Sequence, residues 1–294
     1  MKIDYPLTFE PNFHPALWGG ESWEISAHPA GPSVIANGEL KGRTLSEVMP
    51  DFPLLIKVID AKTRLSVQVH PNEETRKITG GDPKTEMWVM LEDGFIYAGL
   101  KPGVSAKDIE AAVRSGAFEE LMVRHDAKKG ECFFIPGGLV HAIGDNAKIY
   151  EVQQSSDTTF RLYDWNRVGK DGKPRELHVE KSCQAIDYSL PAPQACDEIE
   201  CPFFHFRKLT LAAQEELRDE RLPTVVFDPV GMRSTLVPAG VGFVPGCAGE
   251  YFITTPGSFR SCLHWSSSPS PGSSIVRCLP LSCWRWRGRG CSSC

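Results

Sequence analysis

The sequence predicts a mainly β protein built around an antiparallel sheet. Short runs rich in β-branched and aromatic residues follow one another from Leu54 onward, broken by Gly, Pro and Asp: LLIKVIDA, LSVQVH, EMWVML, GFIYAGL, ECFFI, KIYEVQQ and TTFRLYDW. Runs of this kind are typical of strands joined by turns. Because helical patterns do not alternate with them, an antiparallel sheet is favoured over βαβ units.

One insertion between these runs has the spacing of a helix. The stretch SAKDIEAAVRSGAFEELMVRH opens with Ser105, and Asp108 follows three residues later, which is the pattern of a helix cap. Its apolar residues recur at roughly helical spacing: Ile109, Ala112, Val113, Phe118, Leu121 and Met122. The sequence therefore predicts a short helical element that is broken at Gly116.

Length and composition limit the kind of partner. The chain has 294 residues, 41% of them hydrophobic, which is enough for one large β domain or two ordinary ones. With 37 acidic and 32 basic residues, its net charge of −5 points to neither nucleic acid nor an anionic membrane. A small polar molecule is the expected partner, and no feature predicts a particular oligomeric state.

Targeting signals and cysteines give the expected compartment. The first 20 residues lack an apolar signal core, and no apolar run reaches the length of a bilayer, so we expect a cytoplasmic protein without a membrane span. The cysteines before residue 257 form no CxxC pair and are expected to be reduced, scattered thiols: Cys132, Cys183, Cys196, Cys201 and Cys247.

The composition and the sequence pattern of the chain change twice toward its C-terminus. A Pro-rich linker at Ser189 to Pro193 precedes a new β-type run, FFHFRKLTL, so we expect residues 1–190 to form the main domain and 191–256 a second, smaller β domain. Beyond about residue 220 the expected β pattern does not continue, which predicts that the second domain is incomplete.

Residues 257–294 form an atypical tail. It has no Asp or Glu, is rich in Ser, Cys, Arg and Trp, and keeps neither strand nor helix periodicity, so it is expected to be disordered. A basic aromatic patch for nucleic acid, a cysteine metal cluster and a product of a shifted reading frame are the three interpretations. The last is favoured because the loss of acids and the loss of pattern coincide.

The alternation of side chains between the two faces of a strand predicts a candidate metal site. If LSVQVH is a strand, Ser66, Gln68 and His70 share one face and the apolar residues take the other. The same parity places Lys84 and Glu86 together in KTEMW. Two potential ligands two residues apart can then share one ion inside a sheet that curls into a barrel.

A second histidine completes the set. In GECFFIPGGLVHAIGDN, a Pro-Gly-Gly turn would deliver His141 to the rim of the same sheet. Together with Gln68, His70 and Glu86 it offers two imidazole nitrogens and two oxygens, which suits a borderline cation such as Zn²⁺ and leaves room for water or substrate. With one charged ligand the centre would stay positive and suit an anionic intermediate. Taken singly, each residue has an ordinary structural explanation, and only their joint spacing favours metal binding.

These motifs resemble a known family. GECFFIPGGLVHAIGDN resembles the second cupin motif, and SVQVHPNEETRKITGGDPKTEMW resembles the first motif as modified in the type I mannose-6-phosphate isomerases. LTFEPNFHPALWGG and LLIKVIDAKTRLSVQVHP are also similar to that family, so the likeness spans most of residues 5–190. It implies a cupin-type jelly-roll β-barrel as the main, catalytic domain.

The resemblance also implies roles for individual residues. One zinc ion per chain would be held by Gln68, His70, Glu86 and His141. Arg161 in SSDTTFRLYDW would be an active-site residue, with Asp157 four residues before it, and Lys84 would face the substrate. Lys57 and Ser66 match positions near the substrate phosphate. For Lys57 an anion partner is physically reasonable, because an unpaired ammonium in the apolar run LLIKVID would be costly.

The implied reaction interconverts mannose 6-phosphate and fructose 6-phosphate through a cis-enediolate. Lys84, Asp157 and a metal-activated water are the alternatives for the proton shuttle, and Arg161 would stabilise the oxyanion. Two other functions compete. A non-catalytic cupin that binds a sugar phosphate as a regulator would need none of these groups, and an iron-dependent dioxygenase would want more imidazoles than this site offers.

Overall fold

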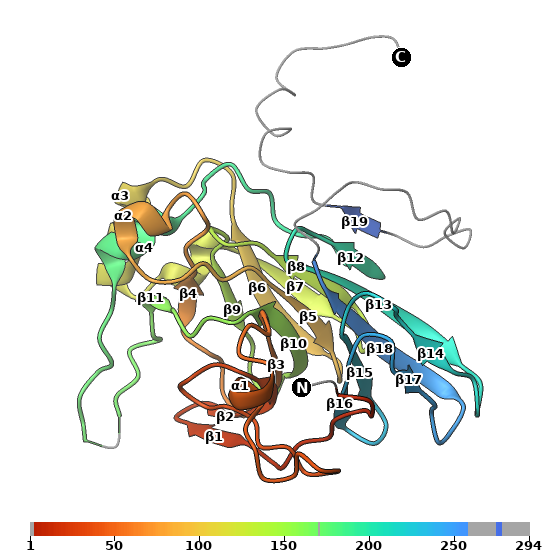
Figure 1. The fold of residues 1–294 in the computed structure, drawn as a ribbon. Coiled ribbons are helices and arrows are strands. Elements are labelled where there is room, and N and C mark those ends of the chain that lie inside the picture. The colour runs from red at the N-terminus through yellow and green to blue at the C-terminus, as the bar shows by residue number, and fades with distance from the viewer. Residues whose placement is uncertain (1–2, 170, 258–274, 278–294) are drawn as a thin grey trace.

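The fold is described from a computed structural model, for residues 3–169, 171–257 and 275–277 (Figure 1). Within these ranges the strands form three large sheets and one two-stranded sheet. Two of the large sheets face each other across a hydrophobic core, and the third covers the other face of the first. The predicted mainly β, antiparallel jelly-roll fold is confirmed.

The first sheet forms the middle of the molecule. Its strands run antiparallel in the order β1–β2–β3–β10–β5–β8. Their bounds are Phe13–Ala16 (β1), Gly19–Ser26 (β2), Leu54–Ala61 (β3), Lys148–Gln154 (β10), Glu86–Met90 (β5) and Cys132–Ile135 (β8). The long apolar run of β3 is explained by its central position, since the sheet is covered on both faces.

The second sheet closes the barrel. Its order is β11–β4–β9–β6–β7, with bounds Phe160–Tyr163 (β11), Val67–Val69 (β4), His141–Ile143 (β9), Gly94–Leu100 (β6) and Met122–Ala127 (β7). The core between the two sheets contains Ile59 and Trp88 from the first and Ile96 and Ile143 from the second, all 2% exposed or less. Burial of these large side chains holds the sheets face to face.

The predicted helical insertion is confirmed with one adjustment. Helix α3 spans Ala106–Ser115, Ser105 and Asp108 form the capping box, and Gly116 ends the helix at a φ of 79°. A 3₁₀ turn at Phe118–Leu121 follows, but Met122 begins strand β7 rather than extending the helical element.

Three further helices were not predicted, because each is only four to seven residues long: α1 (Leu45–Val48), α2 (Arg76–Thr79) and α4 (Val179–Ala185). Helices α2, α3 and α4 lie together at one end of the barrel (Figure 1).

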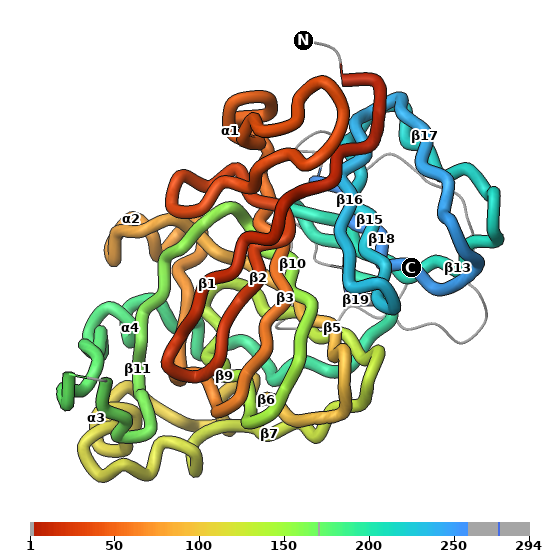
Figure 2. The backbone as a smooth tube through the Cα atoms, turned by 90° about the horizontal axis from the view of Figure 1, so that it is seen from below, coloured from red at the N-terminus to blue at the C-terminus, as the bar shows by residue number. Residues whose placement is uncertain are grey.

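The third sheet packs on the outer face of the first. Its order is β16–β15–β18–β13–β12–β19, with bounds Arg233–Val237 (β16), Thr224–Asp228 (β15), Gly249–Pro256 (β18), Phe204–Leu211 (β13), Glu198–Glu200 (β12) and Ile275–Arg277 (β19). The two-stranded sheet pairs β14 (Leu217–Arg218) with β17 (Gly242–Phe243). Tyr150 of the first sheet stacks on Phe227 at 4.4 Å between ring centroids. Figure 2 shows the blue strands β15, β16 and β18 beside the red and orange N-terminal strands.

The C-terminal predictions have mixed outcomes. The expected loss of β structure beyond about residue 220 was wrong, since β15, β16 and β18 all lie beyond it. The alternation of apolar and polar residues in these strands is short and interrupted by Pro and Gly turns, so the strands were not recognised from the sequence. The tail predicted over 257–294 lies outside the described residues except for Gly257 and β19, whose backbone pairs in parallel with β12.

Two simpler expectations concern membranes and thiols. Among the residues that the structure describes, no helix is long and apolar enough to cross a membrane.

The five cysteines before residue 257 are free, as expected. They are not all scattered, because Cys132 and Cys196 face each other in an isolated antiparallel bridge.

Candidate metal and active site

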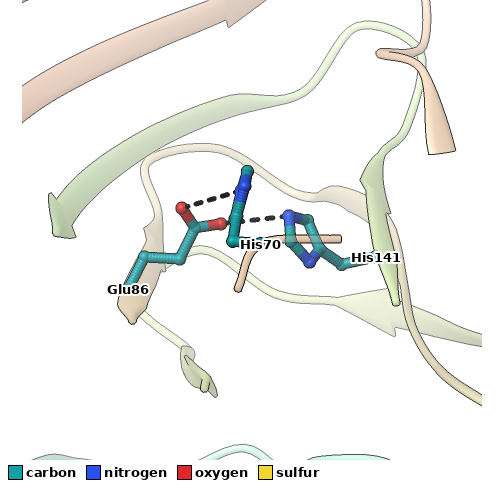
Figure 3. A group of neighbouring side chains, drawn as sticks. All are labelled: His70, Glu86 and His141. Carbon is teal, nitrogen blue, oxygen red and sulfur yellow. Dashed lines mark ion pairs between the residues drawn. The ribbon is translucent and has the colours of Figure 1, made fainter. Parts of the chain in front are cut away.

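Three of the predicted ligands converge inside the barrel. His70 directly follows β4, Glu86 begins β5 and His141 begins β9, and each is 1% exposed or less. His70 Nε2 lies 3.5 Å from Glu86 Oε2, and His141 Nε2 lies 3.2 Å from Glu86 Oε1. In Figure 3 the two rings point toward the carboxylate from different segments of the chain.

The ligand atoms have no hydrogen-bond partners. Both ring nitrogens of His70, both oxygens of Glu86 and Nε2 of His141 are buried without a hydrogen bond, although both histidines lie within ion-pair distance of Glu86. His141 Nδ1 lies 2.8 Å from the carbonyl of Leu139. Because a carbonyl can only accept, Nδ1 carries the proton and the lone pair of Nε2 points at the cluster, which is the usual arrangement of a metal-binding histidine.

The protonation states also fit a cation. Burial lowers the pKa of His70 well below its usual value and that of His141 to about 3, so both rings are neutral near pH 7 and able to coordinate. Burial and the charge of Glu151 raise the pKa of Glu86 to about 8. A cation among the three groups would favour the carboxylate form and satisfy atoms that are otherwise costly to bury. The residues present therefore fit a bound metal.

Gln68, the fourth predicted ligand, lies on the strand next to His141. It lies in β4 between Val67 and Val69, which are both buried, so the predicted alternation of faces holds for these three residues. Its Cα pairs directly with that of His141 in β9. Residues paired in this way leave the sheet on the same face, with their Cβ atoms roughly 5 Å apart.

Arg161 and Lys84 are the two predicted cationic residues of the site, and they lie on different segments of the chain. Arg161 in β11 pairs with Gln68 in β4, so Arg161, Gln68 and His141 form one row across three strands. Lys84 is 5% exposed, and its Nζ lies 3.8 Å from Glu86 Oε2. Lys84 thus places an ammonium beside Glu86, and Arg161 lies on the strand next to Gln68.

The other two predicted residues of this group, Ser66 and Asp157, differ in their exposure. Ser66 is buried, one residue before β4. Asp157 is exposed on the segment between β10 and β11, and the structure does not bring it into the buried cluster.

Lys57 is buried in ion pairs. Its Nζ lies 2.9 Å from Glu21 Oε2 and 3.4 Å from Glu151 Oε1. Burial disfavours the charged ammonium, but the charges of Glu151 and Glu21 outweigh this and raise the pKa of Lys57. The charge that the apolar run would have left unpaired is therefore balanced within the chain.

Sequence analysis missed Glu151 and Gln153. Glu151 is 3% exposed, accepts a hydrogen bond from Trp88 Nε1 at 2.8 Å and pairs across the sheet with Lys57. Gln153 pairs with Glu86 across β10 and β5, and its buried Oε1 has no partner. Polar residues in the otherwise apolar run KIYEVQQ could have indicated a buried polar site. Glu151 and Gln153 are two residues apart, so they lie on the same face of the strand.

Replacement of Lys57 by methionine is expected to lower the free energy of unfolding by about 3–5 kcal/mol, because two carboxylates would lose their buried partner. Urea denaturation followed by fluorescence measures the difference. The matched control is Lys62→Met, which removes an ammonium 70% exposed and paired with Asp60, and should change stability by less than about 1 kcal/mol. Equal stability of the Lys57 variant and the parent would show that these ion pairs do not hold the barrel together.

Comparison with known proteins places these features in a family. Residues 10–87 match the family described as phosphomannose isomerase type I, catalytic domain. The chain is 35% identical over 261 residues to mannose-6-phosphate isomerase ManA of Bacillus subtilis, a match that covers 74% of this chain and 82% of that protein. It is also 35% identical over 219 residues to the mannose-6-phosphate isomerase of Streptococcus mutans, covering 64% and 69% respectively.

Solved structures agree with the sequence relatives. The crystal structure of mannose 6-phosphate isomerase from Bacillus subtilis superposes with a TM-score of 0.74 and 26% identity, covering 85% of this chain and 99% of the other. A putative mannosephosphate isomerase from Archaeoglobus fulgidus has the same fold, with a TM-score of 0.63 at 16% identity and coverage of 87% and 97%. By its fold and by its identity over most of a relative's length, the chain belongs to the type I phosphomannose isomerase family.

Proposed function

We propose that this protein is a zinc-dependent isomerase that interconverts mannose 6-phosphate and fructose 6-phosphate. The observation that carries the proposal is the buried set of unpaired ligand atoms on His70, Glu86 and His141, in a chain whose relatives are named for this reaction. The ligand atoms of the three residues lie within 4.8 Å of one another, close enough to share one ion. One zinc ion per chain is part of the proposal.

Gln68, His70, Glu86 and His141 are the residues that would hold the metal. Two imidazoles, an amide oxygen and a carboxylate form a donor set that zinc accepts. When bound, the cation would polarise the sugar carbonyl and offset negative charge on the neighbouring oxygens. Because one ligand is charged, the site would keep a net positive charge.

The residues around the ligands supply the remaining chemistry. Aldose–ketose interconversion removes a proton from the carbon beside the carbonyl and returns one to the neighbouring carbon, with a cis-enediolate between the two steps. Lys84 is our proposed proton shuttle, because it is buried and its Nζ lies beside Glu86. Asp157 and a metal-activated water are the alternatives, and the exposure of Asp157 makes it the weaker of the two side chains.

Arg161 is proposed to stabilise the enediolate. Its guanidinium stays protonated at any working pH and lies on the strand next to Gln68. A fixed positive group beside a developing oxyanion lowers the barrier without taking part in proton transfer.

Ser66 and Lys57 are proposed to lie near the substrate phosphate. Support for Ser66 is its buried position at the start of the ligand strand. For Lys57 the two ion pairs favour an indirect role, in which it keeps Glu151 in place.

The experiment that tests the function follows both sugar phosphates in heavy water. We expect purified protein to equilibrate mannose 6-phosphate and fructose 6-phosphate from either direction and to place solvent deuterium at C2 of the aldose and C1 of the ketose. Incorporation is expected because the side chain that removes the carbon-bound proton exchanges it with solvent and then returns a deuteron to the enediolate. Saturable binding without turnover would favour the regulator instead, and turnover without any deuterium would argue against the enediolate.

A further inference from the structure

The segment that returns to the barrel after β11 lies against Arg161. The backbone N–H of Arg161 donates to His178 Nδ1 at 3.1 Å, and its carbonyl accepts from the N–H of His178 at 2.7 Å. The guanidinium is held as well, since Nη1 donates to the carbonyl of Glu176 at 2.9 Å. Residues 176–178 therefore fix both the backbone and the side chain of Arg161.

A partly buried ion pair fixes the position of that segment. Asp164 directly follows β11, and its side chain is 5% exposed. Its Oδ2 accepts from Arg175 Nε at 2.8 Å and its Oδ1 from Arg175 Nη2 at 2.6 Å. Two parallel bonds from a planar guanidinium set direction as well as distance. Because Arg175 immediately precedes Glu176, this pair determines where the Glu176 carbonyl lies.

Asp164 also balances the charges around Arg161. Arg167 Nη2 lies 3.7 Å from Asp164 Oδ1, so two guanidiniums form ion pairs with this carboxylate, and its charge also acts on Arg161. Burial lowers the pKa of Arg161, the charge of Arg175 acts in the same direction, and Asp164 opposes them. Loss of the carboxylate would leave mutually repelling groups and favour movement of Arg161 toward solvent.

We propose that Asp164 and Arg175 are positioning residues that hold the Arg161 guanidinium beside the row of Gln68 and His141. They do not touch the reacting atoms. They act through the Glu176 carbonyl and through the charge balance. The inference rests on the proposed function, in which Arg161 stabilises the anionic intermediate.

The first test measures the freedom of Arg161 without using turnover. Phenylglyoxal labels accessible guanidinium groups, and peptide mass spectrometry gives the labelling rate at Arg161. We expect Arg175→Lys and Asp164→Asn each to raise that rate severalfold, because the two parallel hydrogen bonds between Arg175 and Asp164 are lost while the fold remains. The matched control is Arg124→Lys, which removes a guanidinium that donates two hydrogen bonds to one oxygen of Asp126 on β7 and should leave the rate unchanged. An unchanged rate in folded Arg175→Lys protein would overturn the proposal.

The second test asks whether the effect passes through Arg161. Arg175→Lys should lower kcat by roughly 10- to 100-fold, as expected when a catalytic group is misplaced by about 1 Å, with far less change in KM and none in zinc content. In an Arg161→Ala background the same substitution should have no further effect on kcat. An equal loss in both backgrounds would assign Arg175 another role. If the parent protein gave no turnover, the proposed function would fail, and the labelling rates would still decide the positioning.

Discussion

Replacement of His141 by alanine is expected to abolish stoichiometric zinc binding and to lower kcat/KM by roughly a thousandfold or more. His141 supplies one of two imidazole nitrogens in the cluster, and its Nε2 already points at Glu86. A cation that offsets transition-state charge contributes several kcal/mol, and each 1.4 kcal/mol corresponds to about a tenfold change in rate. Metal analysis and initial rates on the same preparation measure both effects.

The matched control for that variant is His125→Ala. His125 is also partly buried and contacts the carbonyl of Ala98 at 3.1 Å, but it lies on β7 outside the cluster. Zinc content and turnover should both be retained in the control. A His141 variant with one zinc per chain would contradict the ligand assignment.

Replacement of Arg161 by alanine is expected to keep the bound zinc and lower kcat by roughly 100- to 1,000-fold, the usual effect of removing one preorganised group beside an oxyanion. Arg161 is not a ligand, so metal content should not change. KM should change much less than kcat, because the guanidinium is proposed to act mainly on the developing charge.

Arg114→Ala provides the comparison for nonspecific loss of a guanidinium. Arg114 is 71% exposed on α3 and pairs with Glu110 on the same helix. It should behave like the parent. Parental turnover in the Arg161 variant would remove Arg161 from the mechanism and, with it, the purpose of the Asp164–Arg175 pair.

The sequence predicted the ligand strand because the relevant information is local. Alternation in LSVQVH was enough to place Gln68 opposite to Val67 and Val69, and the structure confirms it. The capping box at Ser105 and the stop at Gly116 were predictable for the same reason, since both depend on residues within one or two turns.

Contacts between distant strands could not be predicted in this way. The pairing of Lys57 with Glu151 depends on the register of β3 and β10, which are separated by nearly a hundred residues of chain. Sequence patterns fix which face a residue takes, but not which residue stands opposite. Lys57 was therefore recognised as a costly buried charge, while its partners Glu21 and Glu151 were not found.

The Asp164–Arg175 pair shows the same limit at shorter range. The two residues stand on either side of an irregular segment, where neither strand nor helix periodicity applies. Only the folded chain brings Arg175 back to the end of β11, where its fork meets a buried carboxylate.

The most direct test of the metal site is a zinc titration of protein stripped with a chelator. Turnover of mannose 6-phosphate is measured after each addition, and bound zinc is determined on the same samples. The account predicts negligible activity in the stripped protein and a linear rise that stops at one zinc per chain. Full turnover in protein shown to be free of metal would contradict it, because the buried atoms of His70, Glu86 and His141 would then have another purpose.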